Sequence, residues 1–194
     1  MKINKSFVFA AIGLVSILVG AFIFHRIKSY DNEFKKVQNA DELVITQLKK
    51  IRVAQKAYFD VHNRYASTWD SLVYFIENDK FAVVENKEKI EMINGEEKIS
   101  TVADTLELIS VYDSLQSKLK LPKDKLHTIA DLPQEEGQFK LYVSSRNGEN
   151  YIEVTDPKPV NPRRKPNADK HFEIVMKPLR FGSKSAITTK GNWE

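Results

Sequence analysis

Histidine is the residue type of this chain best suited to chemistry, because an imidazole serves as a metal ligand or as a general base. The chain has four histidines and no cysteine, which excludes thiol catalysis, Cys-based zinc sites and disulfides. The spacings HxxxH and HExxH are absent, as are GxSxG and a glycine-rich phosphate loop. The sequence therefore predicts no enzyme, no metal site and no cofactor. The four are His25, His62, His127 and His171.

A cluster of positive charge is the next candidate site. Arg163, Arg164 and Lys165 lie in the segment 156–170, which contains four prolines and is not expected to form regular structure. Two interpretations stay open: a contact with acidic lipid, glycan or a partner protein, or a solvated connector. No aromatic stacking pattern surrounds these charges, so nucleic acid is not an expected partner.

Three small residues form a third candidate. Gly13, Ser16 and Gly20 are three and four positions apart, so a helix would place them near one face. Small residues there let another transmembrane helix approach closely. The alternative is that they only reflect the ordinary composition of membrane spans.

The elements that position these candidates differ strongly in composition. The chain has 194 residues, 42% of them hydrophobic, and a net charge of +4. Its mean hydropathy of −0.40 suits a soluble protein. The segment from Phe7 to Phe24, however, contains no charge and only Ser16 as a polar residue. As a helix it spans about 27 Å, close to the hydrocarbon thickness of a bilayer.

This segment is predicted to be an uncleaved signal anchor that ends near Ile27. A cleavable signal peptide is the alternative, but the apolar run is too long, and bulky residues follow where small cleavage-site residues belong. Lys2 and Lys5 precede the run, and basic residues from Arg26 to Lys36 follow it. Because a basic tip before an apolar run is typical of export signals, we expect a cytoplasmic N-terminus and an exported body.

The segment 29–62 contains no glycine or proline and is predicted to be a long amphipathic helix. Its stripe is interrupted by Asp41 and Gln55. It is expected to dock on the chain's own sheet, with a coiled coil to another chain as the alternative. The apolar members of the stripe are Phe34, Val37, Val44, Leu48, Ile51, Tyr58 and Val61.

A second helix is predicted to begin after Ser67 or Thr68, either of which can cap its first turn. The remainder indicates antiparallel sheet. Asn147-Gly148 between two alternating segments predicts a tight hairpin over 138–155, and Asn94-Gly95 a second one. Residues 106–121 fit a strand followed by a helix. Further strands are expected at 81–84, 89–93, 98–102, 171–176 and 184–189.

The order of these elements, together with residues 47–78 (QLKKIRVAQKAYFDVHNRYASTWDSLVYFIEN), resembles type IV pilins and type II secretion pseudopilins over roughly residues 1–80. In that family the turn after the long helix often reads Gly-x-Tyr-Pro, and only Tyr65 matches here. Ser6 and Ala11 stand where a prepilin carries glycine and glutamate. The resemblance implies a pilin-like envelope protein with no catalytic residues, and the two departures argue against processing and polymerisation by the family's usual route.

The predicted fold is therefore α+β, with an N-terminal transmembrane helix that continues as an amphipathic helix on a small antiparallel sheet. The predicted parts are a cytoplasmic tip (1–6), the transmembrane helix (7–27), the long helix and turn (28–66) and a globular domain (67–194). The predicted function is that of a structural or accessory subunit in a bacterial inner-membrane machine, with the globular domain in the periplasm. Its expected partners are the membrane and other envelope proteins, in a hetero- or homo-oligomer. The alternative is an anchored module that binds peptidoglycan, lipid or another envelope ligand.

Overall fold

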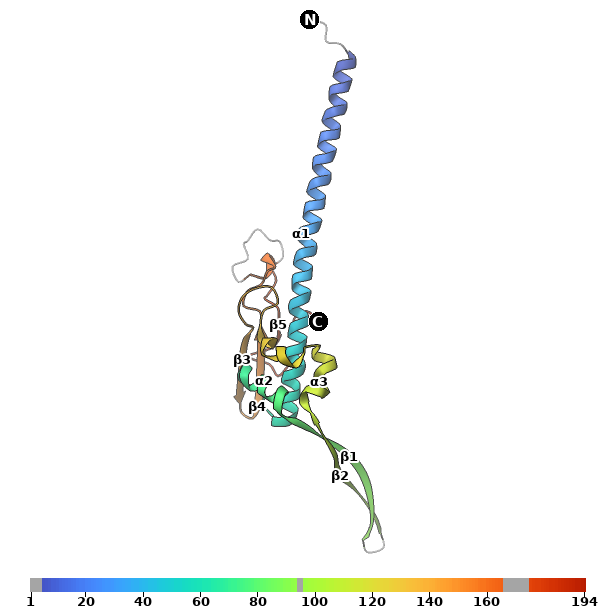
Figure 1. Ribbon diagram of the computed structural model, residues 1–194, viewed down its shortest axis with the longest axis vertical. Coiled ribbons are helices and arrows are strands. Elements are labelled where there is room, and N and C mark those ends of the chain that lie inside the picture. Colours follow the sequence, from blue (N-terminus) through green and yellow to red (C-terminus); the bar gives the residue numbers. More distant parts are fainter. Residues whose placement is uncertain (1–4, 94–95, 166–174) are drawn as a thin grey trace.

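The computed structural model describes residues 5–93, 96–165 and 175–194. Its longest element is the helix α1 (Lys5–His62), whose 58 residues extend for about 87 Å. The N-terminal half of α1 stands clear of the rest of the chain, and its C-terminal half runs through the body (Figure 1). The predicted apolar helix and its amphipathic continuation are thus one uninterrupted element.

Helix α1 ends where the sequence predicted. Asn63 adopts a left-handed conformation with φ of 53°, and its N–H donates to the carbonyl of Phe59 at 2.8 Å. Helix α2 (Trp69–Asn78) follows, with Thr68 as its cap, because the Thr68 hydroxyl accepts the N–H of Ser71 at 3.2 Å. Its buried side chains are Leu72, Phe75 and Ile76.

The strands β1 (Lys80–Ile93) and β2 (Glu96–Ser110) form one long antiparallel ladder with a single register shift between Val83 and Val84. The sequence predicted shorter strands here, because charged residues interrupt the apolar pattern. Backbone pairing continues through those residues. The turn predicted at Asn94-Gly95 lies outside the described residues. The hairpin leaves the body on the side opposite to the free half of α1 (Figure 1).

The segment after β2 is helical, as predicted. Strand β2 ends at Ser110, and helix α3 (Val111–Leu119) begins at the next residue. A 3₁₀ helix, η1 (Lys123–Ala130), follows. Both bury an apolar face, made of Val111, Tyr112, Leu115 and Leu119 in α3 and of Leu126, Ile129 and Ala130 in η1.

The second hairpin consists of β3 (Lys140–Arg146) and β4 (Glu149–Thr155). Asn147 and Gly148 have φ values of 54° and 81°, which is what a two-residue turn requires. Leu141 pairs with Val154, and Val143 with Ile152, so the predicted apolar face is confirmed.

The third strand of this sheet differs from the prediction. It is β5 (Arg180–Gly182), which pairs with β4 in the order β3-β4-β5. The predicted strand 184–189 is wrong, because Gly182 turns the chain away with φ of 78°. A Cβ at Gly182 would lie 2.0 Å from the carbonyl oxygen of Ile152, so only glycine fits. Of the predicted strand 171–176, residues 171–174 lie outside the described residues, and Val175 and Met176 belong to no strand.

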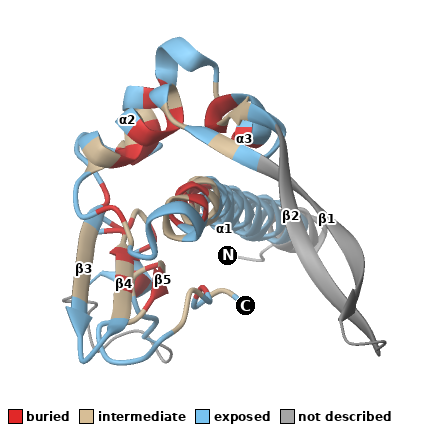
Figure 2. Ribbon diagram, turned by 90° about the horizontal axis from the view of Figure 1, so that it is seen from below, coloured by how far each residue is buried: buried red, intermediate tan, exposed pale blue. Residues whose placement is uncertain are grey.

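The core surrounds the C-terminal half of α1. Seen along the helix, α1 lies between α2 and α3 on one side and the sheet β3-β4-β5 on another (Figure 2). Val44, Leu48 and Ile51 of the predicted stripe are buried, whereas Phe34 and Val61 at its ends are exposed. The stripe contacts α2, α3 and η1 as well as β5, so its docking surface is mostly helical instead of the sheet alone. The architecture is a mixed helix and sheet fold with small antiparallel sheets.

Candidate functional site

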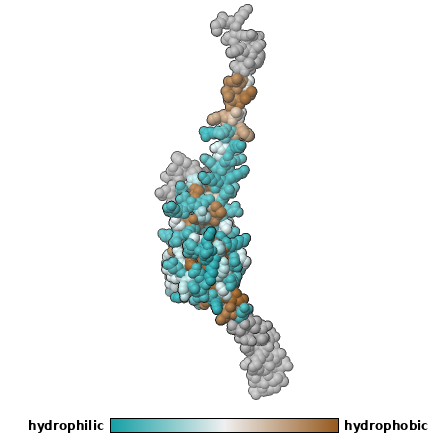
Figure 3. Space-filling view, viewed as in Figure 1, coloured by the Kyte–Doolittle hydropathy of each residue, from teal (hydrophilic) through white to brown (hydrophobic). Residues whose placement is uncertain are grey.

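The first candidate site is the apolar part of α1. By length and composition this helix is able to cross a membrane, as a membrane anchor or a signal sequence does. Figure 3 shows the hydrophobic surface that it presents above the hydrophilic body. Its large apolar side chains are each between 51% and 73% exposed; they are Leu14, Val15, Ile17, Leu18, Val19, Phe22, Ile23, Phe24 and Ile27.

The predicted packing residues Gly13, Ser16 and Gly20 lie on this exposed part of α1. A Cβ added at Gly13 or Gly20 meets no atom of the described chain within 4 Å, so neither glycine is required by a contact among the described residues.

The second candidate site, the basic cluster, is divided by the structure. Arg164 does not belong to an exposed basic tip: it is 8% exposed, and its Nε donates to Asp41 of α1 at 2.8 Å. Its Nη1 donates to the carbonyl of Lys177 at 3.0 Å. Arg163 and Lys165, on either side of it, are exposed. Arg164 therefore fastens the loop to the long helix, and only its two neighbours face outward.

Asn161 completes this attachment. Its Nδ2 donates to the same oxygen of Asp41 at 3.0 Å, and its Oδ1 accepts the N–H of Arg163 at 3.1 Å. The second bond begins a short 3₁₀ helix, η2 (Pro162–Arg164), in a segment predicted to lack regular structure. Proline is compatible with the first position of a helical turn, where no N–H is needed. The two bonds to Asp41 explain why a carboxylate interrupts the stripe of α1.

A buried carboxylate lies at the start of the same loop. Asp156 is 3% exposed, and one of its oxygens accepts the N–H of Lys158 at 2.9 Å. Burial raises the pKa of Asp156 above its usual value, and the negative charges of Asp41 and Glu135 add to the increase. The Lys158 N–H and the Arg164 charge act in the opposite direction without cancelling it. The loop 156–165 is thus held by three buried polar side chains, those of Asp156, Asn161 and Arg164.

A groove of about 430 Å³ lies between this loop and α1. Its wall on α1 begins at Tyr30 and ends at Asp41, directly after the apolar segment. Along the helix axis this is about 5 to 20 Å beyond Ile27. The groove is mainly apolar, and Arg163 is one of its lining residues. Its other lining residues are Glu33, Phe34, Val37, Gln38, Asn161, Pro162 and Met176.

The far end of α1 carries a second buried polar attachment. Gln55 is 1% exposed, and its amide makes two hydrogen bonds with the backbone of Ala66. The N–H of Ala66 donates to Gln55 Oε1 at 3.0 Å, and Gln55 Nε2 donates to the Ala66 carbonyl at 3.1 Å. Gln55 therefore interrupts the apolar stripe in order to fix the turn between α1 and α2.

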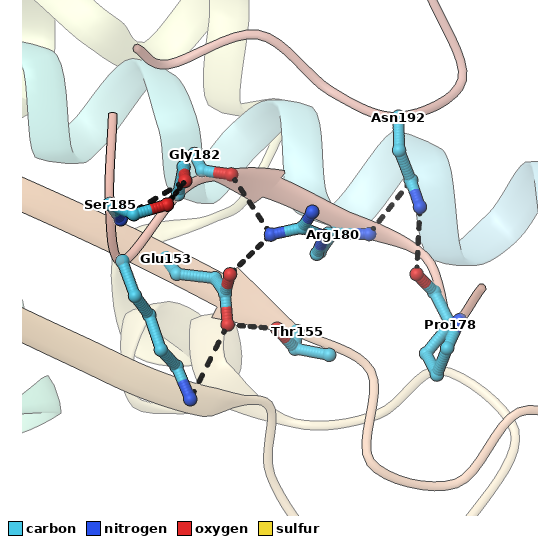
Figure 4. A network of polar contacts seen from close by, with 9 residues as sticks. Glu153, Thr155, Pro178, Arg180, Gly182, Ser185 and Asn192 are labelled. Atoms are coloured by element: carbon cyan, nitrogen blue, oxygen red, sulfur yellow. Dashed lines mark hydrogen bonds and ion pairs between the residues drawn. The ribbon is translucent and has the colours of Figure 1, made fainter. Parts of the chain in front are cut away.

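The C-terminal segment is fastened to the sheet and to α1. Figure 4 shows Arg180 of β5 paired with Glu153 of β4, while Asn192 accepts the N–H of Arg180 at 3.0 Å. Asn192 also donates to the carbonyl of Pro178 at 2.8 Å. Arg52 of α1 pairs with Glu194 at 2.5 Å. These contacts hold the end of the chain against the body.

The three described histidines, His25, His62 and His127, do not converge. His62 lies against the rings of Tyr58 and Phe75, with centroid distances of 4.3 and 5.5 Å, and its Nε2 is 3.5 Å from Asp79. His25 and His127 are exposed in separate elements, and His171 lies outside the described residues. Within residues 5–93, 96–165 and 175–194, no three His, Asp or Glu side chains gather as a metal site would require.

The full length of the hairpin β1–β2 was not predicted from the sequence, because charged residues interrupt the apolar alternation of its strands. Compared with family models, with curated proteins and with solved structures, the chain matches none of them.

Proposed function

We propose that the chain is a non-enzymatic, membrane-anchored structural or accessory subunit of a bacterial envelope machine that serves secretion, motility or pilus-like assembly. The observation that carries this proposal is the continuity of α1. Leu18 is 60% exposed in an apolar segment, whereas Leu48 of the same helix has no exposed surface in the core. One stiff element therefore joins a segment suited to lipid with a packed, polar body.

The arrangement favours a protein that acts by holding its body at a set distance from the membrane, where other proteins can bind it. Half of its helix is free and half is packed in an α+β body, as in the pilins and pseudopilins that residues 47–78 resemble. In this proposal α1 crosses the inner membrane once, the N-terminus is cytoplasmic and the body lies in the periplasm. The body and the hairpin then contact other envelope proteins at a fixed height above the membrane.

The anchor is tested with two exposed leucines of the same helix. Leu18 is 60% exposed and Leu43 is 48% exposed, but only Leu18 lies in the apolar segment. An arginine at the centre of a membrane helix costs about 3 kcal/mol, so Leu18→Arg should weaken retention of the full chain in carbonate-washed membranes. Leu43→Arg is the matched control and should leave retention unchanged. Equal behaviour of the two variants contradicts the anchor.

The partner contacts and the fate of the N-terminus need separate measurements. Crosslinking in intact cells should recover a defined complex of the chain with other envelope proteins, and a chain that stays monomeric contradicts the proposed function.

The intact mass of the mature chain distinguishes the two uses of the apolar helix. An anchor retains residues 1–27, whereas a cleaved signal sequence does not.

A second candidate function is the binding of an anionic envelope ligand, and the position of the loop supports it. Arg163 and Lys165 are exposed beside an apolar groove that begins directly after the apolar segment. At that height a phospholipid could place its headgroup phosphate near the two cations and its acyl chain on the helix.

The test retains Arg164, because that residue holds the loop. Full chain carrying both Arg163→Gln and Lys165→Gln is purified in mild detergent, and its bound phosphatidylglycerol is counted by native mass spectrometry. A severalfold loss relative to the unchanged chain supports the site. The matched control replaces Lys118 and Lys123, two exposed lysines of the body, with glutamine. Equal lipid counts in both double variants contradict this second function.

A further inference from the structure

A second groove, of about 630 Å³, lies between α2, η1 and the start of β3. Helix α2 buries Leu72, Phe75 and Ile76 in the core, and residues of its other side line the groove. Figure 2 shows the start of β3 close to α2. The volume falls within the range of about 300 to 1,000 Å³ that small-ligand sites occupy. The groove is therefore large enough for a small molecule or for a short stretch of a polymer.

Two aromatic side chains line this groove. Trp69 is partly buried and packs against the core, so its ring is held in place. Tyr74 is 66% exposed, so its ring stands at the surface. Val73 and Leu141, both partly buried, add apolar surface to the lining. Because the face of an aromatic ring carries partial negative charge, such rings attract the C–H groups of a flat ligand.

The polar side chains of the groove have unused hydrogen-bonding capacity. Within the described residues, no hydrogen bond or ion pair engages four of these side chains, which are those of Asp70, Tyr74, Glu77 and His127. The Gln138 amide makes one side-chain hydrogen bond, at 3.3 Å. The two carboxylates only accept, whereas the hydroxyl, the imidazole and the amide both donate and accept. A suitable ligand thus presents donors and acceptors beside an apolar face.

Position and charge exclude two classes of ligand. Gln55 fixes the turn directly before the groove and lies 28 positions after Ile27, or about 42 Å along α1. With the chain anchored as proposed, a membrane lipid is therefore out of reach of the groove. Of the described residues that line the groove, none is a lysine or an arginine, whereas Asp70 and Glu77 are acids. An anionic ligand is therefore repelled.

We propose that this groove binds a carbohydrate chain. A sugar ring has a C–H face that stacks on Trp69 or Tyr74, and hydroxyl groups at its edge that donate and accept hydrogen bonds. Asp70 and Glu77 are seven residues apart, or about 10.5 Å along α2, so they bind different hydroxyl groups of an extended ligand. A basic peptide would donate to these acids but leave the donors of Tyr74 and Gln138 unused. The inference goes beyond the proposed function, and only the exclusion of lipid rests on the anchor.

The stacking part is tested with two exposed tyrosines. Tyr74 is 66% exposed and Tyr30 of α1 is 64% exposed, so neither alanine variant disturbs the core. Full chain in a mild detergent without a sugar headgroup is titrated with two probes, cellotetraose and the tetramer of N-acetylglucosamine, by calorimetry. At least one tetramer should bind, and the probe that binds identifies the kind of sugar. Tyr74→Ala should weaken that binding severalfold, whereas Tyr30→Ala should leave it unchanged.

The hydrogen-bonding part is tested with two exposed acids. Asp70 and Asp113 each lie in the first turn of their helix, α2 and α3, so both substitutions remove the same charge from a helix start. Asp70→Asn should weaken binding of the same tetramer severalfold, and Asp113→Asn should not.

Three outcomes overturn the inference. They are that neither tetramer binds the unchanged chain, that Tyr74→Ala and Asp70→Asn bind as well as their controls, and that an oligolysine peptide occupies the groove in preference to both tetramers. Calorimetry on the purified chain does not depend on the anchor, so the two proposals fail separately. Sugar binding by a chain that carbonate removes from membranes contradicts the anchor alone. A retained chain that binds no tetramer contradicts this inference alone.

Discussion

The two halves of α1 form one helix but have different surroundings. From residue 13 to residue 39 every residue except Val37 is exposed, although much of the segment is apolar. From Ala40 to Ala57 every turn contributes a buried side chain. Packing stabilises the second half, as it does most helices of globular proteins. Among the described residues, the loop 156–165 first lies along the helix at the groove that begins at Tyr30, so the apolar residues 13–27 stand outside the body.

Polar side chains show the same difference. In the C-terminal half they reach distant segments: Asp41 binds Arg164, Gln55 binds Ala66, and Gln47 donates to the carbonyl of Ile129 at 2.8 Å. In the N-terminal half the contact of Arg26 is local, 5.7 Å from the ring centre of Phe22 one turn earlier. The C-terminal half is thus the centre of the body, and most of the N-terminal half lies outside it.

The largest effect is expected from truncating a core leucine in the C-terminal half, and a leucine in the N-terminal half serves as the comparison. Leu48→Ala removes a side chain with no exposed surface and should lower the free energy of unfolding of the body by about 2 to 5 kcal/mol. Leu18→Ala, at a site 60% exposed, should leave that free energy unchanged. Chemical denaturation in mild detergent, followed by circular dichroism, measures both. If Leu18→Ala destabilises the body as much, the two halves are not independent.

The same comparison between the two halves of α1 is made with two polar residues, Gln55 in the C-terminal half and Gln38 in the N-terminal half. Gln55→Ala leaves the buried N–H and carbonyl of Ala66 without their partner, which should cost about 2 to 3 kcal/mol. Gln38→Ala, at an exposed position, should change the midpoint of the same denaturation curve little. A Gln55 variant as stable as the Gln38 variant indicates that the turn at Ala66 holds without the amide.

The boundary between the halves is tested at Asp41. Arg164→Met leaves that partly buried carboxylate with Asn161 as its remaining partner and should destabilise the body by about 2 kcal/mol. This is less than for a fully buried pair, because the Asp41 side chain is 20% exposed. Lys165→Met changes an exposed residue and should have little effect in the same assay. Equal effects contradict the structural function assigned to Arg164.

The smallest effect is a pH dependence. Because the pKa of Asp156 is raised in the folded state, the folded chain binds this proton more tightly than the unfolded chain. The contribution of Asp156 to the free energy of unfolding is therefore complete below the pKa of the unfolded state. It is lost as the pH rises through the higher pKa of the folded state. Asp156→Asn keeps an oxygen for the Lys158 N–H and should flatten the Tm–pH profile there, raising Tm slightly at neutral pH. Glu42→Gln, at an exposed site, should leave the slope unchanged.

Local signals predicted a large part of this fold. Thr68 was predicted as one of two caps for α2, and Asn147-Gly148 as a hairpin turn, because each depends on a few neighbouring residues. The strand at 184–189 failed for the opposite reason. It has the β-branched residues of a strand, but Gly182, with φ of 78°, redirects the chain just before it, and the N–H of Ser183 donates to the carbonyl of Ile152 at 2.8 Å.

The candidate site was predicted less well than the fold. Arg163, Arg164 and Lys165 are equivalent by charge, and the sequence contains no local signal that separates them. Arg164 pairs with Asp41, which lies 123 positions earlier in the sequence, so this one cation is buried while Arg163 and Lys165 stay exposed. Asp41 and Gln55 themselves were identified as interruptions of a stripe, and their partners became visible only in the body.

Residue types a few positions apart were sufficient to predict the apolar helix, its long continuation, the cap of α2 and the hairpin turn at Asn147-Gly148. Tertiary structure decided which arginine is buried, which polar residues belong in the core and how far the hairpin β1–β2 extends. Those outcomes depend on pairs that are distant in the chain, and on backbone pairing that proceeds through charged residues as readily as through apolar ones.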